Sequence, residues 1–261
     1  MRSLSIGATG MLAQQLNVET ISNNIANMTT TGFKRQRAEF QDLLYQNQRR
    51  VGSTSSDAGT VVPSGVQIGA GVKTAAVYRI NEQGNINPTG NSLDVAINGE
   101  GFFQVLLPNG ETAYTRAGSF EPNAEGTIVT ADGYQVQPGL TIPQNAVDIT
   151  INPNGEVLVK LDGQTEPQNI GQLQLAVFPN AAGLEAIGDN LLLETPASGA
   201  AVTGNPGQPG FGRVIQEALE TSNVNIVSEI TNLITAQRAY EMNSRVISTT
   251  DQMMQSVTQL R

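Results

Sequence analysis

The sequence predicts an α+β protein in which long N- and C-terminal helices form a coiled-coil core domain and an antiparallel all-β domain is inserted between them. Three observations carry this prediction. Apolar residues recur every seven positions near both ends of the chain, a spacing typical of helices that pack against other helices. All twelve prolines and 24 of the 27 glycines lie between residues 52 and 212. Within that block, short β-branched or aromatic runs alternate with turn dipeptides.

Residues 1–32 are predicted to form the N-terminal core helix. Its apolar stripe consists of residues seven positions apart: Leu4, Met11, Val18 and Ile25. Three β-branched threonines followed by Gly32, which can take a positive φ, are expected to end it. An ordinary amphipathic core helix would show the same stripe, but the matching repeat at the other end of the chain favours helices that pair with each other and then with neighbouring copies.

Residues 33–71 are expected to form a connecting region. Its first half holds a basic cluster around Phe40, Leu43 and Leu44. Such a cluster fits a membrane-surface or nucleic-acid patch, but it is more often a solvated face beside an interface. Its second half, residues 52–71, is rich in glycine and serine, which indicates an exposed loop or ribbon rather than core.

Residues 72–195 are predicted to form the antiparallel β domain. The expected strands lie within Val72–Ile80, Leu93–Ile97, Phe102–Leu107, Thr127–Thr130, Tyr134–Gln137, Val147–Ile151, Val157–Leu161, Leu173–Phe178 and Leu191–Glu194. Hairpin turns are expected at Asn98-Gly99, Asn109-Gly110, Asp132-Gly133, Asn154-Gly155 and Asp162-Gly163. Residues 196–220, dense in proline and glycine, are expected to be a return linker.

Residues 221–261, the C-terminal core helix, contain no glycine and no proline. Their heptad stripe is Ile226, Leu233, Tyr240, Ile247 and Met254. A helix from Ile226 to Leu260 would be a rod of roughly 50 Å. Its flanks are mostly Asn, Gln, Ser and Thr, with few ion pairs to support it alone in water. We therefore expect it to be stabilised by packing against other helices.

The composition argues against several kinds of chemistry. The chain has no Cys and no His, which removes thiolate nucleophiles, the usual zinc ligands and the common proton shuttle at physiological pH. Aspartate, asparagine and glycine recur in turns without the spacing of a calcium loop, so we expect no metal site and no cofactor. Carboxylates are numerous enough for a glycosidase pair, but no pair is marked by spacing, and Trp is absent.

The charge is unevenly distributed. Residues 1–50 carry a net charge of +3, residues 51–220 carry −12 and residues 221–261 are neutral, giving −9 for the chain. An acidic middle is not typical of a nucleic-acid-binding protein. No apolar run is long enough to span a membrane, and the N-terminus shows no cleaved secretory signal.

Long motifs near both ends and in the middle carry a resemblance to a known family. The N-terminal motif is SNNIANMTTTGFKRQRAEFQDLL (Ser22–Leu44), and the C-terminal motif is the whole of Thr221–Leu260. Between them lie DVAINGEGFFQV (Asp94–Val105), AYTRAGSF (Ala113–Phe120) and TADGYQVQP (Thr130–Pro138). These segments resemble the bacterial flagellar basal-body rod and hook family. The length and the segment Phe40–Gly71 are most similar to its distal rod subunits.

The resemblance implies a non-enzymatic structural subunit that polymerises into a helical tubular drive shaft and transmits torque to the hook. Its implied partners are further copies of the chain, proximal rod proteins, the hook protein, the rod cap, and P-ring and L-ring proteins. The implied location is the basal-body rod crossing the periplasm, reached by flagellar type III export without a cleaved signal peptide.

Assembly contacts are expected at apolar positions of both terminal segments and at three amides that would satisfy polar contacts between subunits. These residues are Leu4, Met11, Val18, Ile25, Asn23, Asn24, Asn27, Phe33, Phe40, Leu43, Leu44, Ile226, Leu233, Tyr240, Ile247 and Met254. Two alternatives remain open: a proximal rod or hook-family subunit, and, from another class, a secreted β-domain enzyme or adhesin on a helical stalk.

Overall fold

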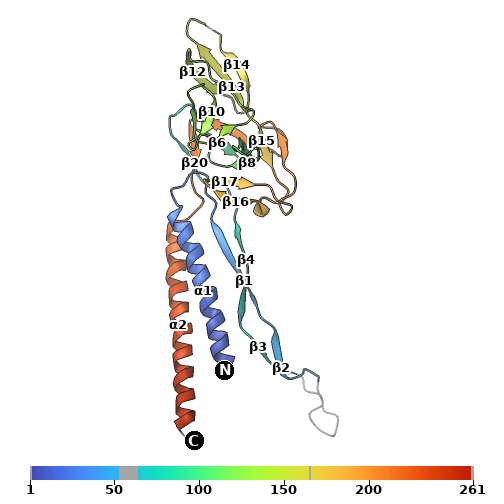
Figure 1. Ribbon diagram of the computed structural model, residues 1–261, viewed down its shortest axis with the longest axis vertical. Helices are drawn as coiled ribbons and strands as arrows, with labels where there is room; N and C mark the ends of the chain where they lie inside the picture. Colours follow the sequence, from blue (N-terminus) through green and yellow to red (C-terminus); the bar gives the residue numbers. More distant parts are fainter. Residues whose placement is uncertain (1, 53–63, 165, 260–261) are drawn as a thin grey trace. The chain divides into compact units, whose positions relative to one another are not determined.

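The computed structural model describes residues 2–52, 64–164 and 166–259. A helix lies near each end of the chain, α1 (Arg2–Ala26) and α2 (Ile226–Gln259), and the region between them consists mostly of strands (Figure 1). The predicted α+β class is therefore confirmed. The chain divides into two compact units. Unit 1 contains Met1–Ile25, Gln36–Tyr78 and Ile226–Arg261, and unit 2 contains Ala26–Arg35 and Arg79–Asn225.

In unit 1, α1 and α2 lie side by side and run antiparallel (Figure 1). Near one end of the pair, a Cβ atom on Gly7 would lie only 2.9 Å from Ile247 Cγ1. Near the other end, Asn24 Nδ2 donates a hydrogen bond to Glu229 Oε2 over 3.3 Å. Residue numbers that rise along α1 while they fall along α2 define the antiparallel register. The absence of a side chain at Gly7 lets the two backbones approach closely there.

Four strands complete the description of unit 1. They are β1 (Gln36–Asp42), β2 (Tyr45–Arg49), β3 (Val66–Gly69) and β4 (Val72–Arg79). β1 pairs with β4, and β2 pairs antiparallel with β3. Val72 N–H donates to the Thr9 hydroxyl over 3.4 Å, which ties the start of β4 to α1. The basic half of the expected connecting region thus forms strands, and residues 53–63 of its Gly/Ser-rich half lie outside the described residues.

Unit 2 is built around a nine-stranded sheet. Its strands are β7 (Phe102–Leu106), β8 (Thr112–Thr115), β9 (Phe120–Pro122), β10 (Ile128–Thr130), β11 (Gln135–Val136), β15 (Leu175–Val177), β16 (Glu185–Gly188), β17 (Leu191–Leu193) and β18 (Val202–Gly204). The order is β16-β17-β8-β7-β11-β10-β9, with β15 joined to β7 and β18 joined to β15. Every strand pair in it is antiparallel.

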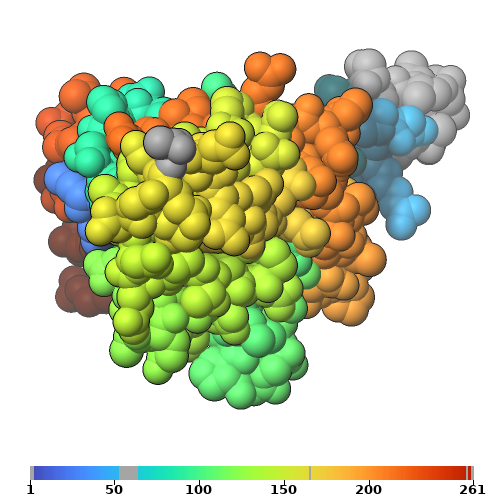
Figure 2. All heavy atoms as spheres, turned by 90° about the horizontal axis from the view of Figure 1, so that it is seen from above, coloured from blue at the N-terminus to red at the C-terminus, as the bar shows by residue number. Residues whose placement is uncertain are grey.

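Unit 2 also contains three smaller sheets. Their strands are β5 (Ile86–Pro88), β6 (Val95–Asn98), β12 (Ala146–Ile151), β13 (Glu156–Leu161), β14 (Gln168–Gln172), β19 (Arg213–Gln216) and β20 (Ala218–Glu220). The pairings are β12-β13-β14, β6 with β19, and β5 with β20. A short 3₁₀ helix, η1, spans Ala181–Gly183. Figure 2 shows the yellow residues of β12–β14 packed against the lime-green segment that precedes them.

The core of unit 2 lies on both faces of β7. Neighbouring strand residues point to opposite faces of a sheet, so Phe103 and Phe102 enter different apolar clusters. Phe103 is fully buried and packs edge-to-face on Phe120, with ring centroids 5.1 Å apart. On the other face, Phe178 makes edge-to-face contacts with Tyr114 at 4.7 Å and with Phe102 at 6.0 Å.

Most of the predicted strands and turns are present. Each of the nine predicted runs overlaps a strand, and four of the five predicted turn dipeptides join hairpin strands. The fifth prediction, a hairpin at Asn98-Gly99, is wrong because β6 pairs with β19 and β7 pairs with β8. Gly99 is required there for another reason: its φ is +110°, and a Cβ on it would lie 2.9 Å from Gly212 Cα.

The segment boundaries differ from those expected. Residues 196–220, expected to be a linker, contain β18, β19 and β20 and belong to unit 2. Prolines and glycines flank β18, whereas β19 and β20 were missed because they are only four and three residues long, although Val214 is almost fully buried. The first helix ends at Ala26, before the threonine run. Gly32 does adopt a positive φ of +69°, but it does so within unit 2, where a Cβ would lie 2.8 Å from Ala117 N.

Candidate assembly interface

One face of α2 is turned towards α1. Its least exposed positions follow one another at spacings of three or four residues, as expected for a face that packs on one neighbouring helix. They are Glu229, Leu233, Ala236, Ala239, Asn243, Ile247 and Thr250. Ala236 is 2 % exposed. The predicted heptad positions Leu233 and Ile247 therefore contribute to pairing within one copy.

The rest of α2 presents large apolar side chains that unit 1 leaves uncovered. They are Ile226, Val227, Ile230, Ile234, Tyr240, Met242, Val246, Met253 and Met254. Their exposed fractions range from 39 % for Met254 to 76 % for Val227. On α1, Leu12 is 67 % exposed. Exposed apolar surface on this scale is typical of a protein–protein interface.

The predicted interface residues fall into three groups. Half-buried ones are Leu4, Met11, Val18, Ile25, Asn27, Phe33, Phe40, Leu43, Leu233 and Ile247. Exposed ones are Asn23, Leu44, Ile226, Tyr240 and Met254. Asn24 alone is buried. Heptad reasoning missed Leu12, Ile230, Ile234 and Met242, because they lie outside the repeating position; a search for apolar residues on the polar flanks of both helices would have found them.

The side-chain amide of Asn24 forms its hydrogen bonds with residues of its own chain. Its Oδ1 accepts a hydrogen bond from Gln36 N over 2.7 Å, and its Nδ2 donates to Gln36 O over 2.8 Å. The same Nδ2 also donates to the buried carboxylate of Glu229. The amide side chain thus pairs with the first residue of β1 as a neighbouring strand would. It fixes β1 to both helices, although the sequence indicated a contact between subunits.

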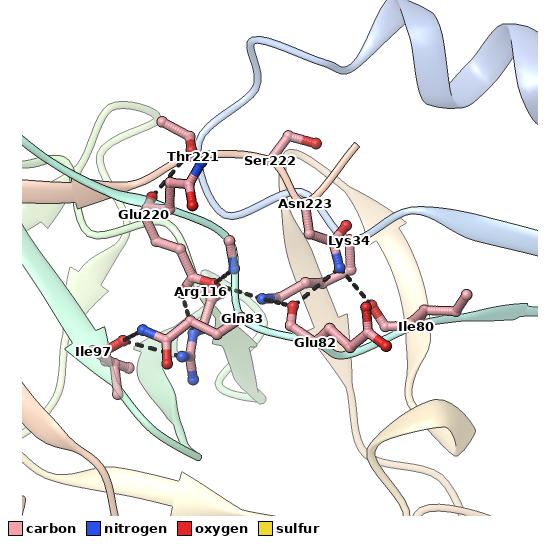
Figure 3. A network of polar contacts seen from close by, with 12 residues as sticks. Lys34, Ile80, Glu82, Gln83, Ile97, Arg116, Glu220, Thr221, Ser222 and Asn223 are labelled. Carbon is pink, nitrogen blue, oxygen red and sulfur yellow. Dashed lines mark hydrogen bonds and ion pairs between the residues drawn. The ribbon is translucent and has the colours of Figure 1, made fainter. Parts of the chain in front are cut away.

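In unit 2, a buried ionic triad joins three segments that are distant in sequence (Figure 3). Glu220 Oε1 accepts a hydrogen bond from Lys34 Nζ over 2.6 Å, and Glu220 Oε2 accepts one from Arg116 Nε over 2.5 Å. The Glu220 side chain is fully buried, and those of Lys34 and Arg116 are 8 % and 7 % exposed. Buried charges are tolerated only when they are paired and hydrogen-bonded.

Further hydrogen bonds satisfy the remaining donors and acceptors of the triad. Arg116 donates to three backbone carbonyls, those of Ile97, Gly99 and Gly101. Gly84 N–H donates to Glu220 Oε1 over 2.8 Å. Burial alone would raise the pKa of Glu220. The charge of Arg116 and the hydrogen bonds from Lys34, Arg116 and Gly84 outweigh burial, so the pKa of this carboxyl lies below its usual value.

The triad lies in unit 2 close to the residues at which the chain joins unit 1. The chain leaves unit 2 after Arg35 and after Asn225, and it re-enters at Arg79. Arg35 N–H donates to Asn223 Oδ1 over 2.7 Å, and Asn223 Nδ2 donates to Ile80 O over 2.9 Å. One polar network within unit 2 therefore fixes all three of these segments to its β-structure.

The described residues show no arrangement suited to metal chemistry. Residues 2–52, 64–164 and 166–259 contain no group of three or more His, Cys, Asp or Glu side chains that could hold a metal ion. In the same residues, no helix is long and apolar enough to cross a membrane.

Comparison with known proteins decides the family. Residues 4–34 match the model "Flagella basal body rod protein", residues 96–159 match "Flagellar hook protein FlgE/F/G D1 domain", and residues 215–260 match "Flagellar basal body rod FlgEFG protein C-terminal". The chain is 66 % identical over 261 residues to a flagellar basal-body rod protein FlgG of Caulobacter vibrioides, covering all of both chains. The chain belongs to the flagellar basal-body rod family.

Two further rod proteins extend the likeness. A FlgG protein of Agrobacterium fabrum is 54 % identical over 258 residues, covering 99 % of this chain and 98 % of its own. A FlgG protein of Bacillus subtilis is 37 % identical over 266 residues, covering 100 % of this chain and 99 % of its own. The predicted resemblance to distal rod subunits is thus confirmed. Members of this family are structural proteins of the flagellar basal body, so this chain is a structural subunit of the rod and not an enzyme.

Proposed function

We propose that this rod subunit polymerises through its two terminal helices into a helical tubular shaft, the distal rod, which transmits torque to the hook. The observation that carries the proposal is the uncovered apolar surface of α2, from Ile226 to Met254. α1 has 25 residues and α2 has 34, so α1 is too short to cover the full length of its partner. Neighbouring copies supply the missing apolar contacts, and their burial drives assembly.

The pairing of α1 with α2 is the first layer of a coiled-coil core. The spacings of three and four residues on the inner face of α2 are close to those of a heptad seam. Polar flanks with few charge pairs give each helix little stability alone. Ordering of the helices and association of the copies are therefore coupled, which suits a chain that reaches its site by type III export, without a cleaved signal peptide, through a growing channel.

The inserted β unit forms the outer layer of the shaft. Residues 51–220 carry seventeen acidic and five basic residues. A wet surface of one charge sign resists adhesion to similar surfaces, which lets the shaft turn inside P-ring and L-ring proteins as it crosses the periplasm. At its two ends the shaft meets proximal rod proteins and the hook protein, and a rod cap covers its growing end.

A comparison of the full chain with a shortened chain tests the proposal. The shortened chain lacks residues 1–28 and 226–261, and we expect it to remain folded and monomeric at concentrations where the full chain forms filaments. Before assembly, limited proteolysis should cut the full chain near its two ends first. A full chain that stays a protease-resistant monomer at all concentrations, or a shortened chain that still forms filaments, would contradict assembly through the helices.

A further inference from the structure

A groove runs between the two helices of unit 1. Gln15, Val18 and Glu19 line it from α1, and Gln237, Tyr240 and Glu241 line it from α2. Val18 is half-buried, and Tyr240 is 44 % exposed, so both offer apolar surface in the groove. Glu19 and Glu241 are both exposed and place one carboxylate on each helix. The groove therefore combines apolar contact area with two negative charges.

The helix register fixes the spacing of these two charges. The Gly7–Ile247, Gly10–Asn243 and Asn24–Glu229 contacts all belong to one antiparallel register. In that register Glu19 is level with position 234 of α2, seven residues from Glu241. At 1.5 Å per residue, the two carboxylates are about 10 Å apart along the groove.

The outer face of α2 carries the opposite charge at the same spacing. Arg238 and Arg245 are both exposed and lie seven residues, about 10 Å, apart on the side of the helix turned away from α1. Met242, 61 % exposed, lies between them on the same face. Among the ion pairs of the described residues, none involves either arginine or Glu241. Glu241 lies three residues after Arg238 and four before Arg245, so it borders this face as well as the groove. With two arginines and one glutamate, the face keeps a net positive charge around Met242.

We propose that the groove of one copy binds the outer face of α2 of a second copy, with Arg238 and Arg245 opposite Glu19 and Glu241. Met242 then packs between them against the apolar lining of the groove. The inference rests on the proposed self-assembly and names the two surfaces that meet. Matching charge spacing sets the axial register between copies, because a shift along the groove separates both charge pairs at once.

The two surfaces are different parts of the same helix pair. A copy whose groove is filled still presents its own Arg238 and Arg245 to a further copy. Such a heterologous contact does not close on itself as an isologous one does, so it can repeat along an open series of copies. This property is the one that a filament-forming subunit needs.

Charge reversal in the full chain tests the pairing. One variant carries Arg238→Glu and Arg245→Glu, and the other carries Glu19→Arg and Glu241→Arg. In each variant, the groove of one copy and the outer face of α2 of the next copy carry charges of the same sign and repel each other. The concentration at which light scattering detects assembly should therefore rise by about tenfold for each variant alone. An equal mixture should assemble at the parent's concentration, because each face then meets a groove of opposite charge.

Controls separate this pairing from a general charge effect. Lys160→Glu with Arg213→Glu lowers the net charge by the same amount as Arg238→Glu with Arg245→Glu, on exposed residues of unit 2, and should assemble as the parent does. Circular dichroism at a concentration where neither chain assembles compares the helix content of each variant with that of the parent. If a reversal unfolds the helices, Arg238→Gln with Arg245→Gln replaces it and should give a smaller rise in the same direction.

Each remaining outcome decides the question. Variants that assemble like the parent would overturn the groove pairing and leave self-assembly intact. Variants that fail alone and also fail when mixed would overturn the pairing, since their charges then act elsewhere. A parent chain that never assembles would overturn self-assembly and the groove pairing together.

Discussion

Lys34 and Glu220 lie 186 positions apart in the sequence, yet their side chains meet over 2.6 Å in the interior of unit 2. Lys34 precedes the point where the chain enters unit 1 for β1, and Glu220 precedes the point where it returns to form α2. In a shaft subunit, torque must pass along these chain segments. The buried pair, with Arg116, fixes both segments to the β-structure of their own unit and so resists their separation.

Removal of the carboxylate should destabilise unit 2 strongly. Glu220→Gln leaves two buried cations without a negative partner, which costs about 3–5 kcal/mol of unfolding free energy. Glu217→Gln is the matched control, because Glu217 is exposed and lies three residues before Glu220. It should change the free energy of unfolding by less than about 0.5 kcal/mol. Urea-induced unfolding followed by circular dichroism measures both. Equal stability of the two variants would show that the triad is not structurally important.

The two cations should not be equivalent. Arg116 binds Glu220 and also three backbone carbonyls, whereas Lys34 binds Glu220 and the carbonyl of Glu82. Arg116→Met should therefore cost about 3–5 kcal/mol, and Lys34→Met about 2 kcal/mol, in the same urea experiment. If Lys34→Met were the more harmful change, the assignment of Arg116 as the central cation would be wrong.

The stabilising effect of Glu220 should disappear in acid. Its folded-state pKa lies below the ordinary value of 4.5, so the triad contributes fully above pH 4.5 and loses its contribution as the pH falls through the folded pKa. The difference in unfolding free energy between the parent and Glu220→Gln should therefore be constant from neutral pH down to about pH 5 and narrow below 4.5. A gap that widened in acid would have the wrong sign for a depressed carboxyl pKa.

Asn24 should hold β1 against the helix pair. Asn24→Leu leaves the backbone groups of Gln36 and the buried Glu229 carboxylate without their amide partner, at a cost of about 1–3 kcal/mol. Hydrogen–deuterium exchange should show faster exchange at the amides of β1 and the last turns of α1. Ser22→Ala, an exposed change on the same helix, should leave exchange unchanged. Unaltered protection in Asn24→Leu would refute this role.

Gly7 and Gly10 both lie where α1 approaches α2 closely, but an alanine should be tolerated at only one of them. On Gly7 a Cβ would lie 2.9 Å from Ile247 Cγ1, near the branch point of that side chain, whereas on Gly10 it would meet the Asn243 amide at its movable end. Gly10→Ala should be neutral or stabilising by up to about 1 kcal/mol, and Gly7→Ala should cost about 1 kcal/mol or more. The assembly concentration of the full chain should rise for Gly7→Ala only; the reverse order would contradict the observed pairing.

Local and periodic features could be predicted from the sequence. Heptad spacing identified both helices, and Asn-Gly or Asp-Gly dipeptides located four hairpins because backbone chemistry determines such turns locally. The prediction at Asn98-Gly99 was wrong because Gly99 serves close packing against Gly212 rather than a hairpin. Strand β1 was missed because its alternation of apolar and charged residues includes only two apolar positions, Ala38 and Phe40, and β2 was missed because Tyr45 is its one apolar residue.

Long-range polar contacts could not be predicted. Nothing in the spacing of Lys34, Arg116 and Glu220 marks them as partners, since the pairing depends on how three separate segments meet. The role of Asn24 was hidden in the same way: an asparagine on a helix flank has the same local pattern whether it contacts its own chain or another. Strand β18 was obscured by the prolines and glycines of residues 196–212, and β19 and β20 were obscured by their lengths of four and three residues.

The central claim is that the terminal helices of many copies form the inner wall of a tube and the β units form its outer layer. A cross-section of assembled filaments of the full chain, determined by electron cryo-microscopy, tests it most directly. We expect α1 and α2 at the smallest radius around a central channel, with residues 226–254 of each copy covered by neighbouring helices. Filaments with the helices on the outer surface, or with β units lining the channel, would contradict the account.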